Sequence, residues 1–379
     1  MDRIYEYLSG QQEEMLQCLK TLVEMESPSD RKELCDPLVE HVAALFVRMT
    51  GGTCHTFRDE TYGNRIRCEW GQGEEQILIL AHCDTVFAQG TLQKNPFRID
   101  AGKAYGPGVF DMKGGLVQTL YALKTLETLR VKPDKRVVLL VTTDEENGSS
   151  SSRQLIEEEA RKSQCVLVPE CSAAPHGSVK TMRKGVGRFR VTVTGRAAHS
   201  GVDFAKGISA VEELARQIIY LQGLTDLAAG TTVNVGVISG GSGINTVPAE
   251  AWADVDLRVN SLAAAETVVP KILELQPVLA GTRIVVNGGL NRPPFERSDG
   301  VEQLYLLAKS LADHYLGFEL GETSTGGGSD GNFTAQIVPT LDGFGAVGDG
   351  AHTNGEYIVV DELPRRAALM ALFLARFAG

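Results

Sequence analysis

Short apolar runs alternate with helix-forming segments in the first half of the chain, and this alternation limits the folds open to it. The apolar runs, at residues 77–80, 137–141 and 165–168, have the length of buried strands. Segments of helical character separate them, at residues 114–129 and 151–162. Parallel strands joined by helices form a sheet that is covered on both faces. The alternation therefore predicts an α/β domain with a mostly parallel central sheet.

A second pattern begins near residue 181, where the strands become half exposed and the order of elements changes. Apolar and polar residues alternate from Phe189 to Thr194, which is typical of a strand with one solvent-facing side. The order of the region is β-α-β-β-α-β, with strands at 189–194, 231–238, 250–259 and 283–286 and helices at 208–221 and 262–275. This order predicts a ferredoxin-like domain. We therefore expect residues 181–291 to be inserted between two parts of the α/β domain, residues 1–180 and 292–379.

The charge and composition argue against several classes of partner. Acidic residues outnumber basic ones by 48 to 37, and the net charge of −11 argues against binding to nucleic acid or to anionic lipid. No apolar stretch approaches the ~18 residues that a membrane-spanning helix needs. The polar, acidic N-terminus predicts no secretory signal. The cysteine count is 7, an odd number without a CxxC pair, which favours reduced thiols and a cytoplasmic location.

Histidine and acidic residues follow three successive strands of the predicted sheet. His82 and Asp84 follow the first apolar run, Glu145 and Glu146 follow the second, and Glu170 follows the third. The carboxyl ends of parallel strands share one edge of a sheet, where ligands bind in open α/β folds. We therefore expect these imidazole and carboxylate groups to lie on one rim. In extended backbone, the spacing of His82 and Asp84 also places both side chains on one face.

Each motif also has a plain structural interpretation when it is taken alone. His82 fits a buried histidine whose hydrogen bonds are satisfied, and Asp111, in GPGVFDMKGG, fits the N-cap of a helix. The other candidates fit ordinary solvated loop residues: Glu145, Glu146, Glu170 and His352. A chemical interpretation therefore depends on several motifs occurring together.

Taken together, a series of motifs in fixed order resembles a known family. The motifs are LAHCDTV, GPGVFDMKGG, DEENGS, VPE, GRAAHSG, GINTVPA, GGGSD and GAHTNGEY. They are similar to those of the dinuclear zinc peptidases and deacylases, a family that includes glutamate carboxypeptidase, acetylornithine deacetylase, the aminoacylases and peptidase T. The resemblance extends over nearly the whole chain. It implies a zinc-peptidase catalytic domain and an inserted ferredoxin-like domain that serves as a lid and for dimerisation.

The resemblance implies a pair of zinc ions, for which cobalt or manganese could substitute. Asp111 would bridge the two ions, His82 and Glu170 would complete one zinc site, and Glu146 and His352 would complete the other. Carboxylate oxygen and neutral imidazole nitrogen are ligands that zinc prefers in proteins. Three carboxylates and a bridging hydroxide would also balance the four positive charges of the two ions. The implied ligand set is therefore chemically consistent.

Roles next to the metal pair also come from the resemblance. Glu145 would be the general base, which takes a proton from the attacking water and passes it to the leaving amine. Asp84 would accept a hydrogen bond from His82 and orient its ring. The peptide bond between Asp111 and Met112 would be cis, as it is in relatives.

Four residues of the later motifs would bind substrate if the resemblance holds. His199 would stabilise the developing oxyanion, and in relatives the equivalent histidine reaches the active site of the partner subunit. Asn245 would help to bind the carbonyl group. Arg258 would bind a substrate carboxylate, with Arg292 as a second candidate and the loop at 326–328 as a source of backbone N–H groups. Taken alone, the histidine fits a loop residue and both arginines fit a solvated surface.

These assignments predict zinc-dependent hydrolysis of an amide bond. The substrate would be a small peptide or an N-acyl amino acid with a free carboxylate, cleaved by a carboxypeptidase- or dipeptidase-type exopeptidase. The alternative is an N-acyl-amino-acid deacylase, similar to acetylornithine deacetylase or succinyl-diaminopimelate desuccinylase. Ser178 stands where glutamate-specific members have a lysine, which argues against strict C-terminal glutamate specificity. The resemblance also implies a homodimer formed through the inserted domain.

Two other classes remain as alternatives. A catalytically silent relative would use the same fold only for binding, but the expected metal ligands and Glu145 are all present. A nucleotide-binding α/β protein would need GxGxxG between a strand and a helix, or GxxxxGK[ST] after a strand. GPG and GVG are present, but neither full motif stands in such a position, which makes this alternative weak.

Overall fold

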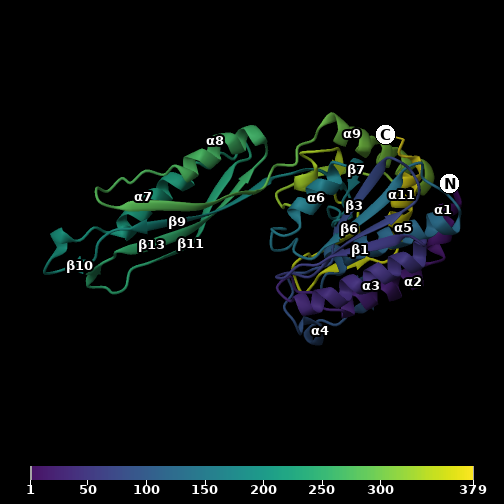
Figure 1. The fold of residues 1–379 in the computed structure, drawn as a ribbon, viewed down its shortest axis with the longest axis horizontal. Coiled ribbons are helices and arrows are strands. Elements are labelled where there is room, and N and C mark those ends of the chain that lie inside the picture. Colours follow the sequence, from purple (N-terminus) through teal and green to yellow (C-terminus); the bar gives the residue numbers. More distant parts are fainter. Residues whose placement is uncertain (1, 379) are drawn as a thin grey trace. The chain divides into compact units, whose positions relative to one another are not determined.

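The computed structural model describes residues 2–378, which fold into two compact units (Figure 1). The first unit comprises the chain up to Met182 together with Arg297–Thr325 and the residues from Ser329 onward. The second unit comprises Arg183–Glu296 and Gly326–Gly328. One inserted segment therefore makes up the second unit, apart from a short glycine loop; the sequence-based prediction for this segment was residues 181–291.

A six-stranded sheet forms the centre of the first unit, in the order β1-β2-β6-β3-β7-β16. Its strands are β1 (Thr53–Phe57), β2 (Arg65–Trp70), β3 (Gln76–His82), β6 (Arg136–Thr142), β7 (Ser163–Leu167) and β16 (Thr340–Leu341). Strands β6, β3, β7 and β16 run parallel to one another, whereas β2 pairs antiparallel with both β1 and β6. The predicted α/β class with a mostly parallel sheet is therefore confirmed.

Helices cover both faces of this sheet, which explains why its central strands are continuously apolar. Ile77 and Ile79 of β3 pack into a large core with the helices of one face: α1 (Asp2–Ser9), α2 (Gln12–Glu24), α3 (Lys32–Thr50), α5 (Gly114–Thr128), α9 (Asp299–Leu311) and α11 (Glu362–Arg376). Leu78 and Leu80 face a smaller core under α6 (Arg153–Ala160) and α10 (Gly331–Thr334). Every residue of β3 is buried, so alternation of polar and apolar residues is absent from this strand.

Short elements complete the first unit. A four-stranded sheet in the order β17-β18-β5-β4 consists of β4 (Arg98–Asp100), β5 (Lys103–Tyr105), β17 (Gly348–Asp349) and β18 (Tyr357–Val359). Two further strands, β8 (Val179–Arg183) and β15 (Glu322–Thr325), form a separate pair, and α4 spans Thr91–Lys94. No helix of the described residues is both long and apolar enough to span a membrane.

The second unit is an antiparallel sheet with two helices packed on one face. The sheet has the order β11-β13-β9-β14, formed by β9 (Gly185–Thr194), β11 (Thr232–Gly240), β13 (Glu250–Val259) and β14 (Arg283–Arg292). Helices α7 (Ala210–Gln222) and α8 (Leu262–Leu273) share its core, and Ser209 and Ser261 cap them by accepting backbone N–H bonds. A short ladder pairs β10 (Ala198–His199) with β12 (Thr246–Val247). Strands and helices therefore occur in the β-α-β-β-α-β order that the sequence predicted.

A buried carboxylate anchors the loop that follows α8. Glu213 of α7 is fully buried and accepts backbone hydrogen bonds from Val278 at 3.0 Å and Leu279 at 2.6 Å. Burial alone would raise the pKa of Glu213, but its hydrogen bonds, led by the one from Gln217, lower it below the usual value of 4.5. The charged form of this carboxylate therefore stabilises the second unit.

We expect Glu213→Gln to lower the free energy of unfolding of the second unit by about 1–3 kcal/mol at neutral pH, because buried N–H groups lose their acceptor. Since the folded-state pKa lies below the unfolded one, this stabilisation is present above pH 4.5 and is lost as the pH falls through the folded-state value. Urea denaturation, followed by the fluorescence of Trp252 in a Trp70→Phe background, measures the effect. Glu212→Gln, at the exposed neighbouring position, is the matched control, and an equal effect in both variants would contradict the assignment.

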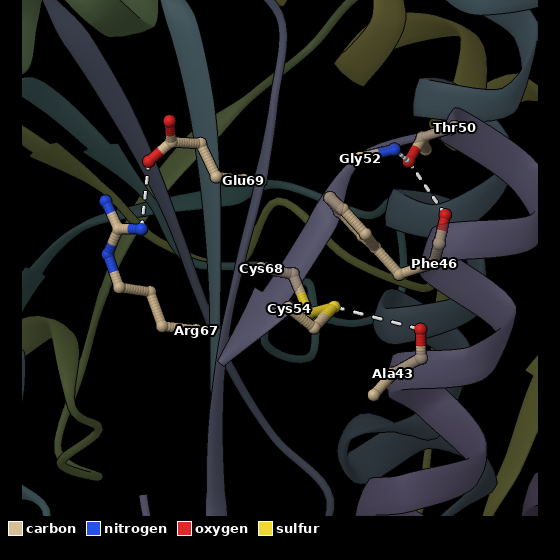
Figure 2. Close-up of a disulfide and its surroundings, with 8 residues drawn as sticks. All are labelled: Ala43, Phe46, Thr50, Gly52, Cys54, Arg67, Cys68 and Glu69. Carbon is tan, nitrogen blue, oxygen red and sulfur yellow. Dashed lines mark hydrogen bonds and ion pairs between the residues drawn. A yellow bond between two sulfur atoms is a disulfide. The ribbon is translucent and has the colours of Figure 1, made fainter. Parts of the chain in front are cut away.

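One disulfide corrects the expectation that all cysteines are reduced. Cys54 of β1 and Cys68 of β2 stand directly opposite each other in the antiparallel register and are joined through their sulfur atoms. Figure 2 shows the bond beside α3, where the Sγ atom of Cys54 lies 3.7 Å from the carbonyl oxygen of Ala43. Cysteine spacing alone cannot reveal such a pair, because the register of two strands depends on the turn between them. The remaining cysteines are free: Cys18, Cys35, Cys83, Cys165 and Cys171.

We expect five thiols to react with an alkylating reagent in denatured, unreduced protein, and seven after reduction. Replacing Cys54 and Cys68 with alanine should lower the free energy of unfolding by about 2–4 kcal/mol, because the open loop gains entropy in the unfolded chain. Mass spectrometry after alkylation gives the thiol count. Seven reactive thiols before reduction would contradict the disulfide.

Candidate metal centre

Three neighbouring parallel strands deliver side chains to one edge of the central sheet. Strand β3 ends at His82, β6 ends at Thr142 shortly before Glu145 and Glu146, and β7 ends shortly before Glu170. Because β3 lies between β6 and β7, the three chain segments leave the sheet side by side (Figure 1). The rim that the sequence predicted is therefore formed by these strand ends.

Asp111 lies at the centre of the group, on the turn that leads into α5. One oxygen, Oδ1, lies 3.3 Å from Nε2 of His82. The other oxygen, Oδ2, lies 3.2 Å from Nε2 of His352, which the loop before β18 carries. The peptide bond between Asp111 and Met112 is cis, as the resemblance implied. A single carboxylate therefore faces two imidazole rings through different oxygens.

Each imidazole also faces a second carboxylate. Nε2 of His82 lies 3.3 Å from Oε1 of Glu170, and Nε2 of His352 lies 3.3 Å from Oε2 of Glu146. The five predicted ligands thus form two imidazole–carboxylate pairs that share Asp111. The sequence separates these residues widely, and the fold brings them together.

The spacing of these atoms fits divalent metal ions better than direct hydrogen bonds. Ligand atoms bound ~2.0–2.1 Å from a tetrahedral zinc ion lie roughly 3.3 Å from one another, which matches the 3.2–3.3 Å observed. Among the described residues, Nε2 of His82, Oδ1 of Asp111 and Oε1 of Glu146 are buried and make no hydrogen bond. Buried polar atoms are normally paired, so these three require a partner of another kind. The residues present therefore fit a pair of metal ions.

The carboxylates also create a strong demand for positive charge. Burial lowers the pKa of His82, but neighbouring carboxylates, led by Asp111, raise it well above its usual value. Asp111 and Glu146 raise the pKa of His352 to about 11. Burial and the charge of Asp111 raise the pKa of Glu146. Bound cations would supply the positive charge that these shifts indicate, and would leave the imidazoles neutral.

Asp84 holds the first imidazole and the acidic loop in place. Its side chain is fully buried, and its backbone oxygen lies 3.1 Å from Nδ1 of His82. Its carboxylate accepts hydrogen bonds from the hydroxyl of Ser29 at 2.6 Å and from the backbone N–H groups of Glu145 and Glu146 at 3.4 and 3.2 Å. The sequence analysis expected the carboxylate of Asp84 to accept the ring N–H of His82, and its Oδ1 lies 3.4 Å from Nδ1. The hydrogen bonds of this carboxylate to the loop of Glu145 are a further contact that the sequence did not indicate.

Glu145 borders the metal centre without belonging to either imidazole–carboxylate pair. Its side chain is 9% exposed, and one of its oxygens lies within 4.8 Å of ligand atoms of His82 and Glu170. Cys171 also lies near Asp111 and Glu170, but its thiol donates to the carbonyl oxygen of Phe110. Burial raises the pKa of Cys171 well above its usual value. Glu145 therefore brings a carboxylate to the border of the ligand group.

Two buried charged residues of the site were missed by the sequence analysis. Glu356 is fully buried and accepts three backbone hydrogen bonds from the turn that carries Asp111. Lys113 is also buried, and its Nζ donates to the carbonyl oxygens of Leu22 and Met25. Both residues stand within motifs that the sequence analysis singled out, Lys113 in GPGVFDMKGG and Glu356 in GAHTNGEY. A charged residue in a polar loop nevertheless gives no signal of burial in a single sequence.

The predicted substrate residues lie in the second unit. Nδ1 of His199, an exposed residue, accepts the backbone N–H groups of Gly201 and Val202 at 3.1 Å, which leaves Nε2 as the protonated nitrogen. The backbone oxygen of Asn245 accepts from the N–H of Ser200 at 3.0 Å. His199 and Asn245 are thus neighbours across the β10–β12 ladder.

The two candidate arginines differ in their surroundings. Arg258 pairs with Asp256 through Nε at 2.9 Å and Nη2 at 3.1 Å, and its Nη1 donates to the carbonyl oxygen of Gly326. It therefore lies beside the glycine loop of the same unit. Arg292 is only 5% exposed, so the alternative of a solvated surface residue is wrong for this position.

Comparisons with known proteins agree with this geometry. The model of peptidase family M20/M25/M40 matches residues 78–376. Carboxypeptidase G2 of Pseudomonas sp. (strain RS-16) is 32% identical over 309 residues, which are 79% of this chain and 74% of that protein. Acetylornithine deacetylase of Pasteurella multocida (strain Pm70) is 31% identical over 205 residues, half of this chain and 52% of that protein. The crystal structure of aminopeptidase PepT from Bacillus cereus has a TM-score of 0.76 at 22% identity, covering 96% of this chain and 98% of that one.

The family match covers most of the chain and includes all five residues of the two imidazole–carboxylate pairs. The likeness to the PepT structure extends over both units and supports the fold. The chain therefore belongs to peptidase family M20/M25/M40 and is a metal-dependent hydrolase of amide bonds.

Proposed function

We propose that the protein is a zinc-dependent exopeptidase of the carboxypeptidase or dipeptidase type, acting on small peptides or N-acyl amino acids with a free carboxylate. The observation that carries this proposal is the arrangement of Asp111, whose two oxygens face His82 and His352 separately. Such a carboxylate suits two ions held side by side. The 32% identity to carboxypeptidase G2 supports the choice of a carboxypeptidase.

The chain's own residues supply the steps around the metal pair. When bound, two zinc ions would lower the pKa of a water molecule toward ~7 and polarise the substrate carbonyl. Glu145 accepts the proton of the attacking water and returns it to the nitrogen of the leaving amine, so that the amide bond breaks without a net change in its own protonation. Asp84 keeps the ring of His82 in the ligating orientation.

The proposed substrate contacts come from the second unit. Nε2 of His199 donates to the developing oxyanion, and the side-chain amide of Asn245 donates to the same oxygen. Arg258 binds the substrate carboxylate, because its planar guanidinium suits paired hydrogen bonds to two oxygens; Arg292 is the second candidate for this contact. These assignments rest on the family resemblance and on the chemistry of each side chain.

A deacylase of N-acyl amino acids is the second candidate. Ser178, where glutamate-specific members have a lysine, argues against strict C-terminal glutamate specificity and so leaves this candidate open. The 31% identity to acetylornithine deacetylase over half of the chain supports it. A silent binding relative is less favoured, since Glu145 and all the proposed ligands are present.

We also propose that the protein is a homodimer formed through the second unit. Strand β11 is an edge strand that exposes Val237 and Ile238, and α7 exposes Ile219 and Tyr220. Exposed apolar side chains at a sheet edge are typical of an interface.

A cytoplasmic location is supported by the five free cysteines, whereas the disulfide between Cys54 and Cys68 counts against it.

We expect a chelator to abolish hydrolysis of peptides and N-acyl amino acids, and added zinc to restore it. Glu145→Gln should lower kcat by roughly 10²–10⁴-fold, because no other group is assigned to move the proton. Release of free amino acid, measured over a panel of both substrate types, gives kcat and KM and separates the two candidate functions. The control is Glu158→Gln, an exposed position on α6. Activity of fully chelated protein would refute the metal role, and full activity of Glu145→Gln would refute the proton transfer.

We expect Arg258→Ala to raise KM by roughly 10–100-fold for substrates with a free carboxylate, as loss of a charged hydrogen-bond partner costs ~1.5–3 kcal/mol. Analogues with an amidated C-terminus should be hydrolysed poorly by both the variant and the wild type. Arg190→Ala is the matched control, because Arg190 pairs with Asp254 on the same sheet as Arg258 pairs with Asp256. Equal KM changes in the two variants would contradict the proposed carboxylate contact.

A further inference from the structure

Glu356 binds the backbone of the turn that presents Asp111 to both imidazoles. Its Oε1 accepts the N–H groups of Phe110 and Asp111, both at 2.8 Å, and its Oε2 accepts the N–H of Gly108 at 3.1 Å. The residue is fully buried. Both carboxylate oxygens are therefore directed at the backbone of one short turn.

The turn depends on this carboxylate because it lies outside the regular ladders of the sheets. The ladder between β18 and β5 ends at the pair Tyr357–Tyr105, shortly before the turn begins. The three N–H groups beyond that point are bound by Glu356 instead. A buried N–H group without an acceptor destabilises a structure appreciably. Beyond the end of the ladder, the carboxylate of Glu356 thus accepts the backbone N–H groups of the turn, up to and including that of Asp111.

The same residue belongs to the loop that carries His352. Within this loop, the N–H of Thr353 donates to the oxygen of Gly350, and the N–H of Glu356 donates to the oxygen of Thr353. His352 itself has a positive φ of 65°, a backbone conformation that non-glycine residues rarely adopt. Glu356 therefore connects the loop of His352 with the turn of Asp111, whose side chains meet at 3.2 Å.

We propose that Glu356 is a positioning residue that fixes Asp111 relative to His352 and so determines the affinity of the metal site formed by Asp111, His352 and Glu146. This inference rests on the proposed pair of metal ions. The other site, with His82 and Glu170, is held by strand ends and by Asp84, so it depends less on Glu356. A purely structural carboxylate would instead stabilise the fold without changing metal affinity.

The test is titration of metal-free protein with Co²⁺, by calorimetry and by visible absorption, for the wild type, Glu356→Gln and Glu356→Ala. The glutamine keeps one oxygen for Phe110 and Asp111 but turns an amide toward the N–H of Gly108. We expect Glu356→Gln to weaken one of the two Co²⁺ equivalents by roughly 10–100-fold and to change its absorption spectrum. Glu356→Ala should have a larger effect. If Glu356→Ala does not fold, Glu356→Gln decides the question.

The matched control is Glu213→Gln, a fully buried carboxylate that also accepts backbone N–H groups but belongs to the second unit. It should lower stability and leave both Co²⁺ affinities unchanged. If Glu356→Gln lowers only the thermal unfolding temperature and binds both ions as the wild type does, the inference is overturned and the proposed function stands. If the wild type binds no Co²⁺, the proposed function fails, and the inference fails with it.

Discussion

A concentration of buried negative charge is the constraint around which the first unit is organised. Asp111, Glu146 and Glu170 meet two imidazole rings at one edge of the sheet, with contacts of 3.2–3.3 Å. Ligand oxygens of Asp111 lie within 4.8 Å of those of Glu146 and Glu170, and like charges this close repel each other strongly when little water separates them. The raised pKa values of both histidines express the same fact, because each ring would take up a proton to supply positive charge. Divalent cations satisfy this demand better than protons, since they bind several carboxylates at once and leave the imidazoles free to act as ligands.

The fold positions some of these ligands at the ends of paired strands and the others on loops that side-chain hydrogen bonds hold in place. His82 stands at the end of β3, which is buried along its whole length between two parallel neighbours. Asp111 and His352 have no such support, because both lie on connecting segments. Asp84 and Glu356 compensate for this difference by accepting backbone N–H groups, Asp84 from the loop of Glu146 and Glu356 from the turn of Asp111. Side-chain acceptors thus take the place of strand pairing where ligands must leave the sheet.

The sequence predicted those features that depend on periodicity and on the position of a residue relative to a strand. The strand ends at His82, Glu146 and Glu170 follow from buried apolar runs, and the parallel sheet then brings them to one edge. Asp111 and His352 became ligand candidates only through the family resemblance, because a glycine-rich loop has no periodicity that indicates where it folds. The disulfide between Cys54 and Cys68 depends on strand register, and the burial of Arg292 depends on tertiary packing. Neither property is encoded locally, so neither could be predicted.

Buried carboxylates in this protein fall into two kinds, and the difference separates structural from chemical roles. Glu213 and Glu356 are fully buried, but their oxygens accept hydrogen bonds from backbone N–H groups, which offset the cost of removing charge from water. The offset is complete for Glu213, whose pKa is lowered, and partial for Glu356, whose pKa burial raises to about 7. Oδ1 of Asp111 and Oε1 of Glu146 are buried without any such donor among the described residues. Evolution of a stable fold alone gives no reason to keep a carboxylate oxygen in that state, since an amide or an apolar side chain would be less costly. In the part of the chain that the structure describes, these oxygens of Asp111 and Glu146 lack a hydrogen-bond donor, whereas both oxygens of Glu356, which binds the turn of Asp111, have donors. The contrast therefore marks the place where a bound cation would complete the structure.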